Sequence, residues 1–144
     1  MASSISRLQA GNIDGRSRSP RFIQDQLQAL HASLLDNAPE IREAIALSSQ
    51  HTAAEIGIEY YLAISCVKAQ YASVDFDQML EDEYSIAKGK DASNRRVAGG
   101  IVYVTPASHT LLYSVIAPLS AAIAAGNVVA VEVSLPDLYP RNNS

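Results

Sequence analysis

The stretch GGIVYVTP at residues 99–106 decides the fold, together with LLYSVIAPLSAAIAA at 111–125 and GNVVAVEV at 126–133. The first and third parts are rich in Val and Ile and apolar on both faces, which is typical of strands inside a covered parallel sheet. The middle part is rich in Ala and Leu, and Gly126 and Asn127 close it with residues that tolerate the left-handed conformation of helix C-termini. The order strand, helix, strand predicts a right-handed βαβ unit, so we expect the α/β fold class.

The chain before this unit predicts a layer of helices. Ser19 followed by Pro20 is a typical helix start, in which the Ser19 hydroxyl caps the helix, and apolar residues recur at helical spacing to about Asp36. Thr52 and Glu55 have the spacing of a capping box. Apolar residues follow at a spacing of three or four from Ile56 to Tyr71, and we expect this helix to continue, with a kink near Ser73, to about Leu80.

Two shorter features complete the prediction. Residues 5–10 predict a short helix that ends at Gly11 and Asn12, and the polar segment after residue 80 allows a hairpin between 84–87 and 95–98. At 144 residues the chain fits one domain. Its predicted parts are a helical layer at 1–80, a polar linker or hairpin at 81–98, the βαβ unit at 99–134 and an irregular tail at 135–144.

Composition excludes several classes of protein. The net charge of -4 provides no electrostatic basis for binding nucleic acid. The most apolar window is interrupted by Pro118 and by the turn at 126–127, so it predicts a buried helix and strand rather than a membrane span. The chain has a single cysteine and no secretory signal pattern at its start, and we therefore expect a cytoplasmic protein without disulfides.

The segments 99–104 and 117–129 also carry a family resemblance. Together they resemble the opening of the aldehyde dehydrogenase superfamily, and the Ala-Ala-Gly-Asn turn at 124–127 is the most specific part of the likeness. The resemblance implies that the βαβ unit corresponds to the first part of a cofactor-binding domain. It is weaker through the N-terminal helices, where the basic turn at 15–22 resembles the shorter class of that superfamily.

The resemblance also implies that redox chemistry has been lost. The family's oxyanion-binding asparagine corresponds to His109 here, and its ribose-binding lysine corresponds to Glu132, which reverses the charge. Cys66 cannot replace the family's catalytic cysteine because it lies in the middle of an apolar helix, where we expect an inert, buried thiol. The resemblance therefore implies a truncated, divergent member that uses no cofactor.

We place the candidate site at the carboxyl ends of the two strands, where ligands bind in open α/β sheets. A histidine there has a pKa suited to proton transfer, and a neighbouring carboxylate can raise that pKa or act as a base. The candidate catalytic residues are His109, Glu132 and Tyr113, and the candidate ligand-binding residues are Ser108, Thr110 and Ser134. The alternatives are a helix-capping or solvent-facing histidine, an exposed strand-end charge, a packing tyrosine and capping hydroxyls. No metal site is predicted.

Three functions remain open. The first is a small-molecule-binding protein that performs a cofactor-free isomerisation or cyclisation, as in a biosynthetic step. The second is a non-catalytic partner that modulates a full-length aldehyde dehydrogenase, and the third is a fragment of an ordinary NAD(P)-dependent aldehyde dehydrogenase. Because two strands do not make a stable parallel sheet by themselves, we also expect a homodimer or a larger homo-oligomer.

Overall fold

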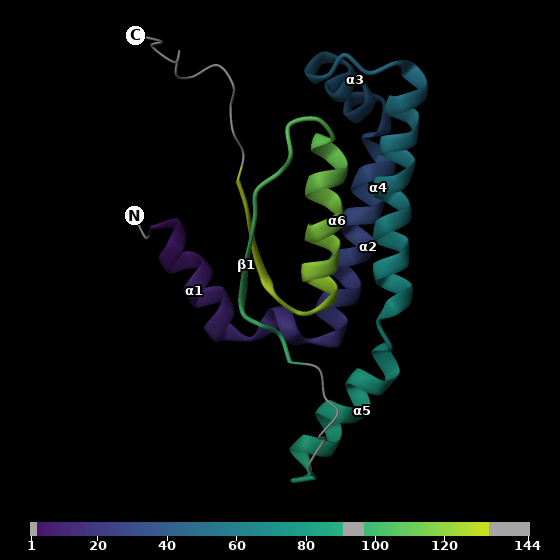
Figure 1. Ribbon diagram of the computed structural model, residues 1–144. Coiled ribbons are helices and arrows are strands. Elements are labelled where there is room, and N and C mark those ends of the chain that lie inside the picture. The colour runs from purple at the N-terminus through teal and green to yellow at the C-terminus, as the bar shows by residue number, and fades with distance from the viewer. Residues whose placement is uncertain (1–2, 91–96, 133–144) are drawn as a thin grey trace.

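The protein is a mixed α/β structure that is mostly helical, with one small parallel sheet (Figure 1). The computed structural model describes residues 3–90 and 97–132. In chain order the elements are α1 (Ser4–Asp14), the 3₁₀ turn η1 (Arg16–Arg18), α2 (Pro20–Asp36), α3 (Ala38–Ser48), α4 (Ala53–Ser73), α5 (Phe76–Ala87), β1 (Ile101–Val104), α6 (Leu111–Ala124) and β2 (Val128–Val131).

The predicted βαβ unit is present. Strands β1 and β2 pair in parallel, with Ile101 opposite Val128 and Val104 opposite Val131, and α6 connects them. Helix α6 runs along one side of the strands and α1 lies on their other side (Figure 1). The sheet is therefore held between one long helix and one short helix.

The expectation that both faces of the sheet are covered is wrong for the described residues. Tyr103 is 65% exposed and Ile101 is 44% exposed, whereas Val104 is buried. Successive side chains of a strand point to opposite faces, so Ile101 and Tyr103 share the face that lies away from buried Val104. Helix α1 contacts both strands but leaves Ile101 and Tyr103 exposed.

The turn between α6 and β2 uses Gly126 and Asn127 in different ways. Gly126 has a φ of 78°, as expected for a helix C-terminus, but no non-glycine residue in the described chain has a positive φ. Asn127 acts through its side chain instead. Its Oδ1 accepts a hydrogen bond from the Gly100 N–H at 2.9 Å, and its Nδ2 donates to the Ala122 carbonyl at 3.4 Å. One amide thus ties the end of α6 to the residue that precedes β1.

The hydrophobic core lies between helices rather than against the sheet. Its buried cluster comes from α2, α4 and α6 and consists of Leu34, Tyr60, Ala63, Ile64, Val67 and Ile116. The apolar stripes predicted along α2 and α4 account for most of these residues. Tyr60 satisfies its buried hydroxyl by donating to the Leu34 carbonyl at 2.7 Å, which links the two helices.

The structure confirms the capping box of α4 and corrects the start of α2. The Thr52 N–H donates to the Glu55 carboxylate at 2.7 Å, and the Glu55 N–H donates to the Thr52 hydroxyl at 3.4 Å. The hydrogen bond from the Thr52 backbone is the main cause that lowers the pKa of Glu55. Helix α2 begins at Pro20 as predicted, but the Ser19 side chain makes no capping hydrogen bond.

Three helix boundaries differ from the prediction. Helix α1 passes through Gly11 and Asn12 and ends at Gly15, whose φ of 71° suits a C-cap. Helix α4 ends at Ser73 instead of continuing to residue 80. A separate helix, α5, then begins because Asp75 Oδ1 accepts from the Gln78 N–H at 3.0 Å.

Helix α5 also replaces part of the predicted hairpin. Residues 84–87 are its last residues, so the first arm of that hairpin is wrong. Asp77 and Gln78 in its first turn suit a capped helix, and its helical spacing of apolar residues outweighs the strand pattern. The second arm, 95–98, lies partly outside the described residues, as do residues 91–94 between the two arms.

Candidate functional site

The carboxyl ends of the two strands lie side by side, as the βαβ prediction requires. The Glu132 N–H donates to the Val104 carbonyl at 2.9 Å, immediately beyond the last paired residues. Residues 105–110 leave β1 at this edge and lead into α6. Of the residues that we predicted for a site, Ser108, His109 and Thr110 therefore lie in this connection and Tyr113 in the first turn of α6, whereas Glu132 follows β2.

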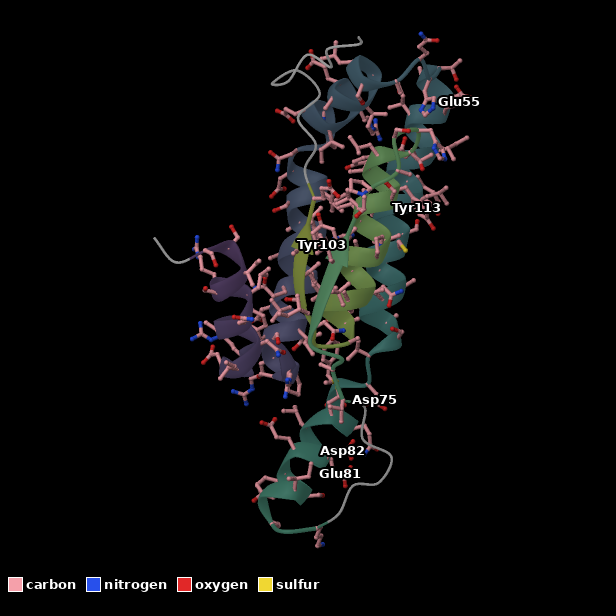
Figure 2. All side chains as sticks on the ribbon, turned by 60° about the vertical axis from the view of Figure 1, so that its left-hand side comes forward. Glu55, Asp75, Glu81, Asp82, Tyr103 and Tyr113 are labelled. Carbon is pink, nitrogen blue, oxygen red and sulfur yellow. The ribbon has the colours of Figure 1, made fainter. Side chains whose placement is uncertain are left out.

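The structure places the residues of this connection as follows. Ser108 and His109 are exposed, and Thr110 is half-buried at the N-cap position of α6. Thr110 makes no capping hydrogen bond through its side chain. Tyr113 lies in the first turn of α6 and is 38% exposed (Figure 2). Ser134 lies outside the described residues.

Glu132 interacts with Tyr103. In the parallel register Tyr103 is opposite Ala130, so Tyr103 and Glu132, two residues further along, share one face of the sheet. A hydrogen bond between the two side chains is the main cause that raises the pKa of Tyr103. Within residues 3–90 and 97–132, no ion pair within 4.0 Å joins Glu132 to His109. A joint action of these two residues stays a prediction.

Glu59 is a site residue that sequence reasoning missed. It is on α4 and is 7% exposed, and its Oε1 accepts a hydrogen bond from the Tyr113 N–H at 3.2 Å. Its Oε2 lies 3.9 Å from His51 Nδ1, in the connection between α3 and α4. A carboxylate at this position satisfies a free backbone donor and complements the positive end of the α6 dipole. Glu59 therefore does the capping that we expected from Ser108 and Thr110.

A sequence signal for Glu59 does exist. It lies three residues after buried Ile56 and four residues before buried Ala63, so it interrupts an apolar stripe with a charge. Buried carboxylates are rare unless they are paired. What the stripe could not reveal is the partner, because the α6 N-terminus is more than 50 residues away in sequence.

Ser114 holds the connection from the other side. Its hydroxyl accepts from the Ala107 N–H at 3.0 Å and donates to the Leu111 carbonyl at 3.0 Å. Together, Ser114 and Glu59 fix both ends of the segment that carries Ser108, His109 and Thr110. Because the segment is anchored at both ends, it can present the exposed His109 imidazole and a neighbouring hydroxyl to a ligand.

The described residues outside this connection provide neither a buried thiol at Cys66 nor a metal site. Cys66 lies on α4 and is half-buried, so our expectation of a fully buried thiol is wrong. Across the described ranges, no group of three His, Cys, Asp or Glu residues is arranged to hold a metal ion. The helices in these ranges also include none with the length and apolar character needed to cross a membrane.

Comparison with known proteins finds a weak similarity to one family. The chain is 29% identical to aldehyde dehydrogenase family 3 member B1 of Mus musculus over 126 residues, which cover 84% of this chain. It spans only 26% of the length of that protein. No protein-family model matches the chain, and neither does any solved structure. These findings support an aldehyde-dehydrogenase-like relationship over part of the chain.

Proposed function

We propose that this aldehyde-dehydrogenase-like chain binds a small carbonyl compound at the carboxyl edge of its strands and moves a proton on it without NAD. The observation that carries the proposal is the connection 105–110, which displays His109 at this edge and is anchored by Glu59 and Ser114. Crevices at this edge of parallel sheets are the usual ligand sites of α/β proteins.

Each candidate residue has a role in the proposal. The His109 imidazole takes a proton from the carbon next to the carbonyl group and returns it at another position, which is an isomerisation. Ser108 and Thr110 bind the carbonyl oxygen through their hydroxyls, and the Tyr113 phenol donates a hydrogen bond to the enolate oxygen that forms while His109 holds the proton. Glu132 supplies a carboxylate at the same edge, where it also interacts with Tyr103. Ser134 remains a candidate ligand-binding residue.

The negative charge of Glu132 supports the proposal that the chain does not use NAD. The resemblance places Glu132 at the position of a ribose-binding lysine, and a carboxylate is repelled by a pyrophosphate. Similarity over 26% of a longer relative nevertheless supports a second candidate, a part of an NAD-dependent enzyme. Calorimetric titration with NAD separates the two, because measurable binding favours this second candidate.

Proton transfer can be tested directly. With cyclohexanone in heavy water, the chain should accelerate the exchange of the protons next to the carbonyl for deuterium, followed by proton NMR. The His109→Ala, Glu132→Ala double variant should reduce the rate to that of the solvent. Glu40→Ala, which removes an exposed carboxylate from α3, is the control and should leave the rate unchanged. Equal exchange rates with the double variant and with the original chain would remove the assigned site.

The proposal includes self-association through the sheet. Within the described residues the sheet has two strands, so each strand has an outer edge without a neighbour, and Ile101 and Tyr103 are exposed on one face. Edges of this kind template pairing with another chain. A second copy of this chain is the proposed partner, because identical edges can pair with two-fold symmetry.

A further inference from the structure

A groove between α2 and α4 forms a second candidate site. It has a volume of about 390 Å³ and is lined by Leu27, Gln28, His31, Val67, Lys68 and Tyr71. This volume falls in the range of about 300–1,000 Å³ that is typical of small-molecule pockets. None of these residues belongs to the candidate site at the strand ends.

The floor of the groove is apolar and fixed. Leu27 is 0% exposed and Val67 is 1% exposed, and these residues are anchored in α2 and α4 respectively. Both are part of packed helices, so the floor is already formed before any ligand binds. Because these two side chains expose almost no area, the surface open to an aliphatic or aromatic body comes from the Tyr71 ring and the methylene chain of Lys68.

The polar groups of the groove are mainly donors. The Tyr71 hydroxyl accepts hydrogen bonds from Gln24 Nε2 at 2.8 Å and from Gln28 Nε2 at 3.0 Å. Because two amides already donate to this oxygen, its own proton is directed to a further acceptor. His31 Nε2 is buried and has no hydrogen-bond partner among the described residues. A buried imidazole nitrogen without a partner calls for an explanation, and a ligand atom provides one.

Lys68 adds a positive charge to the rim. Within the part of the chain that the structure describes, no carboxylate lies within 4.0 Å of its ammonium group. The adjoining hollow is lined by Asp75 and Asp77, which repel anions, and Figure 2 shows Asp75 at the junction of α4 and α5. A negative charge is therefore favoured in the Lys68 groove and disfavoured next to it.

We propose that this groove binds a small organic anion that has a carboxylate head and an apolar body. The carboxylate pairs with the Lys68 ammonium group and accepts from the Tyr71 hydroxyl and from the Nε2–H of His31. The body lies against the Tyr71 ring and the methylene chain of Lys68, above the buried Leu27 and Val67. Charge-assisted hydrogen bonds of this kind are about twice as strong as neutral ones, so the charge of the head decides affinity.

The test uses the full chain and two pairs of matched probes. Hexanoate and benzoate should bind and shift the backbone amide NMR signals of α2 and α4 around the groove. Hexanamide and benzamide have the same shapes without the charge, and they should bind about tenfold more weakly or not at all. Equal affinity of the amides, or failure of both carboxylates to shift these signals, would overturn the proposal.

Two variants locate the head of the ligand. Lys68→Ala should weaken benzoate binding about tenfold or more, while Lys88→Ala removes the same charge from the C-cap position of α5 and should leave it unchanged. Tyr71→Phe keeps the ring and should weaken binding several-fold. Both altered residues lie on α4 and outside the buried cluster, so the fold should be kept. Circular dichroism checks this. Unchanged affinity in Lys68→Ala counts against the site, whatever the outcome of the exchange test at His109.

Discussion

Asn127 closes the βαβ unit through its side chain and not through its backbone. Its amide bonds the Gly100 N–H and the Ala122 carbonyl, so a single residue couples the start of β1 to the end of α6. Gly126, by contrast, contributes its backbone, because its φ of 78° is unfavourable for any residue with a Cβ. The two neighbours of one tight turn are thus selected by different physical requirements.

Replacement of Asn127 by alanine should lower the free energy of unfolding by about 1–3 kcal/mol, since it leaves the half-buried Gly100 N–H without a partner. Urea unfolding followed by circular dichroism measures the change. Asn127→Asp keeps an acceptor for the same N–H and should lose less. Equal stability of the alanine variant and the original chain would show that the clamp contributes nothing.

The Tyr103 and Glu132 pair should have a signature at alkaline pH. The carboxylate holds the pKa of Tyr103 above its ordinary value of 10.0, so the folded chain keeps this proton after the unfolded chain has lost it. This contribution to stability is complete below pH 10.0 and decreases as the pH rises through the folded pKa.

Glu132→Gln should move the ionisation of Tyr103 down toward its ordinary range, because an amide oxygen is a weaker acceptor for the phenol than a carboxylate and carries no charge that opposes the phenolate. Ultraviolet absorbance of the phenolate follows the titration, and Tyr103→Phe identifies which part of the curve belongs to this residue. An identical curve for the Glu132→Gln variant would show that the two side chains do not interact in solution.

At the scale of elements, α6 depends on a residue of α4 for its first turn. The helix begins after Thr110, which does not cap it, and the Tyr113 N–H donates to Glu59 instead. Glu59→Ala should therefore increase hydrogen exchange at the amides of residues 111–114 and lower the stability by about 1–3 kcal/mol. Hydrogen exchange followed by NMR gives both values.

Glu59→Gln is the matched variant, because its amide oxygen can still accept from Tyr113. It should protect the first turn of α6 better than alanine does. If both variants exchange like the original chain, the carboxylate does not cap α6, and the connection that carries His109 must be held by Ser114 alone.

At the scale of the whole molecule, the two-stranded sheet and the uncovered face of Tyr103 predict self-association. Light scattering coupled to gel filtration should show a dimer or a larger oligomer, and Tyr103→Lys should shift it toward the monomer, because a charge opposes burial of that face. Tyr84→Lys, on an exposed part of α5, is the control. A monomer at every concentration would contradict the proposed association.

Part of this architecture followed from sequence because the forces that produce it are local. The Thr52 and Glu55 capping box, the apolar stripes of α2 and α4 and the strand, helix, strand order all depend on residues a few positions apart. The break between α4 and α5 was expected only as a kink near Ser73 in one helix, because the local Asp75 cap competes with a continuing helical pattern.

The site was decided only in three dimensions. Sequence alone placed His109 and Glu132 at one sheet edge, but the alternation of side chains along the strand directed Glu132 to Tyr103. The residues that anchor the connection and line the groove come from different helices, as Glu59 with Tyr113 and Gln24 with Tyr71 show. Periodicity determines which face of a helix is buried, whereas the packing of helices distant in sequence determines what that face meets.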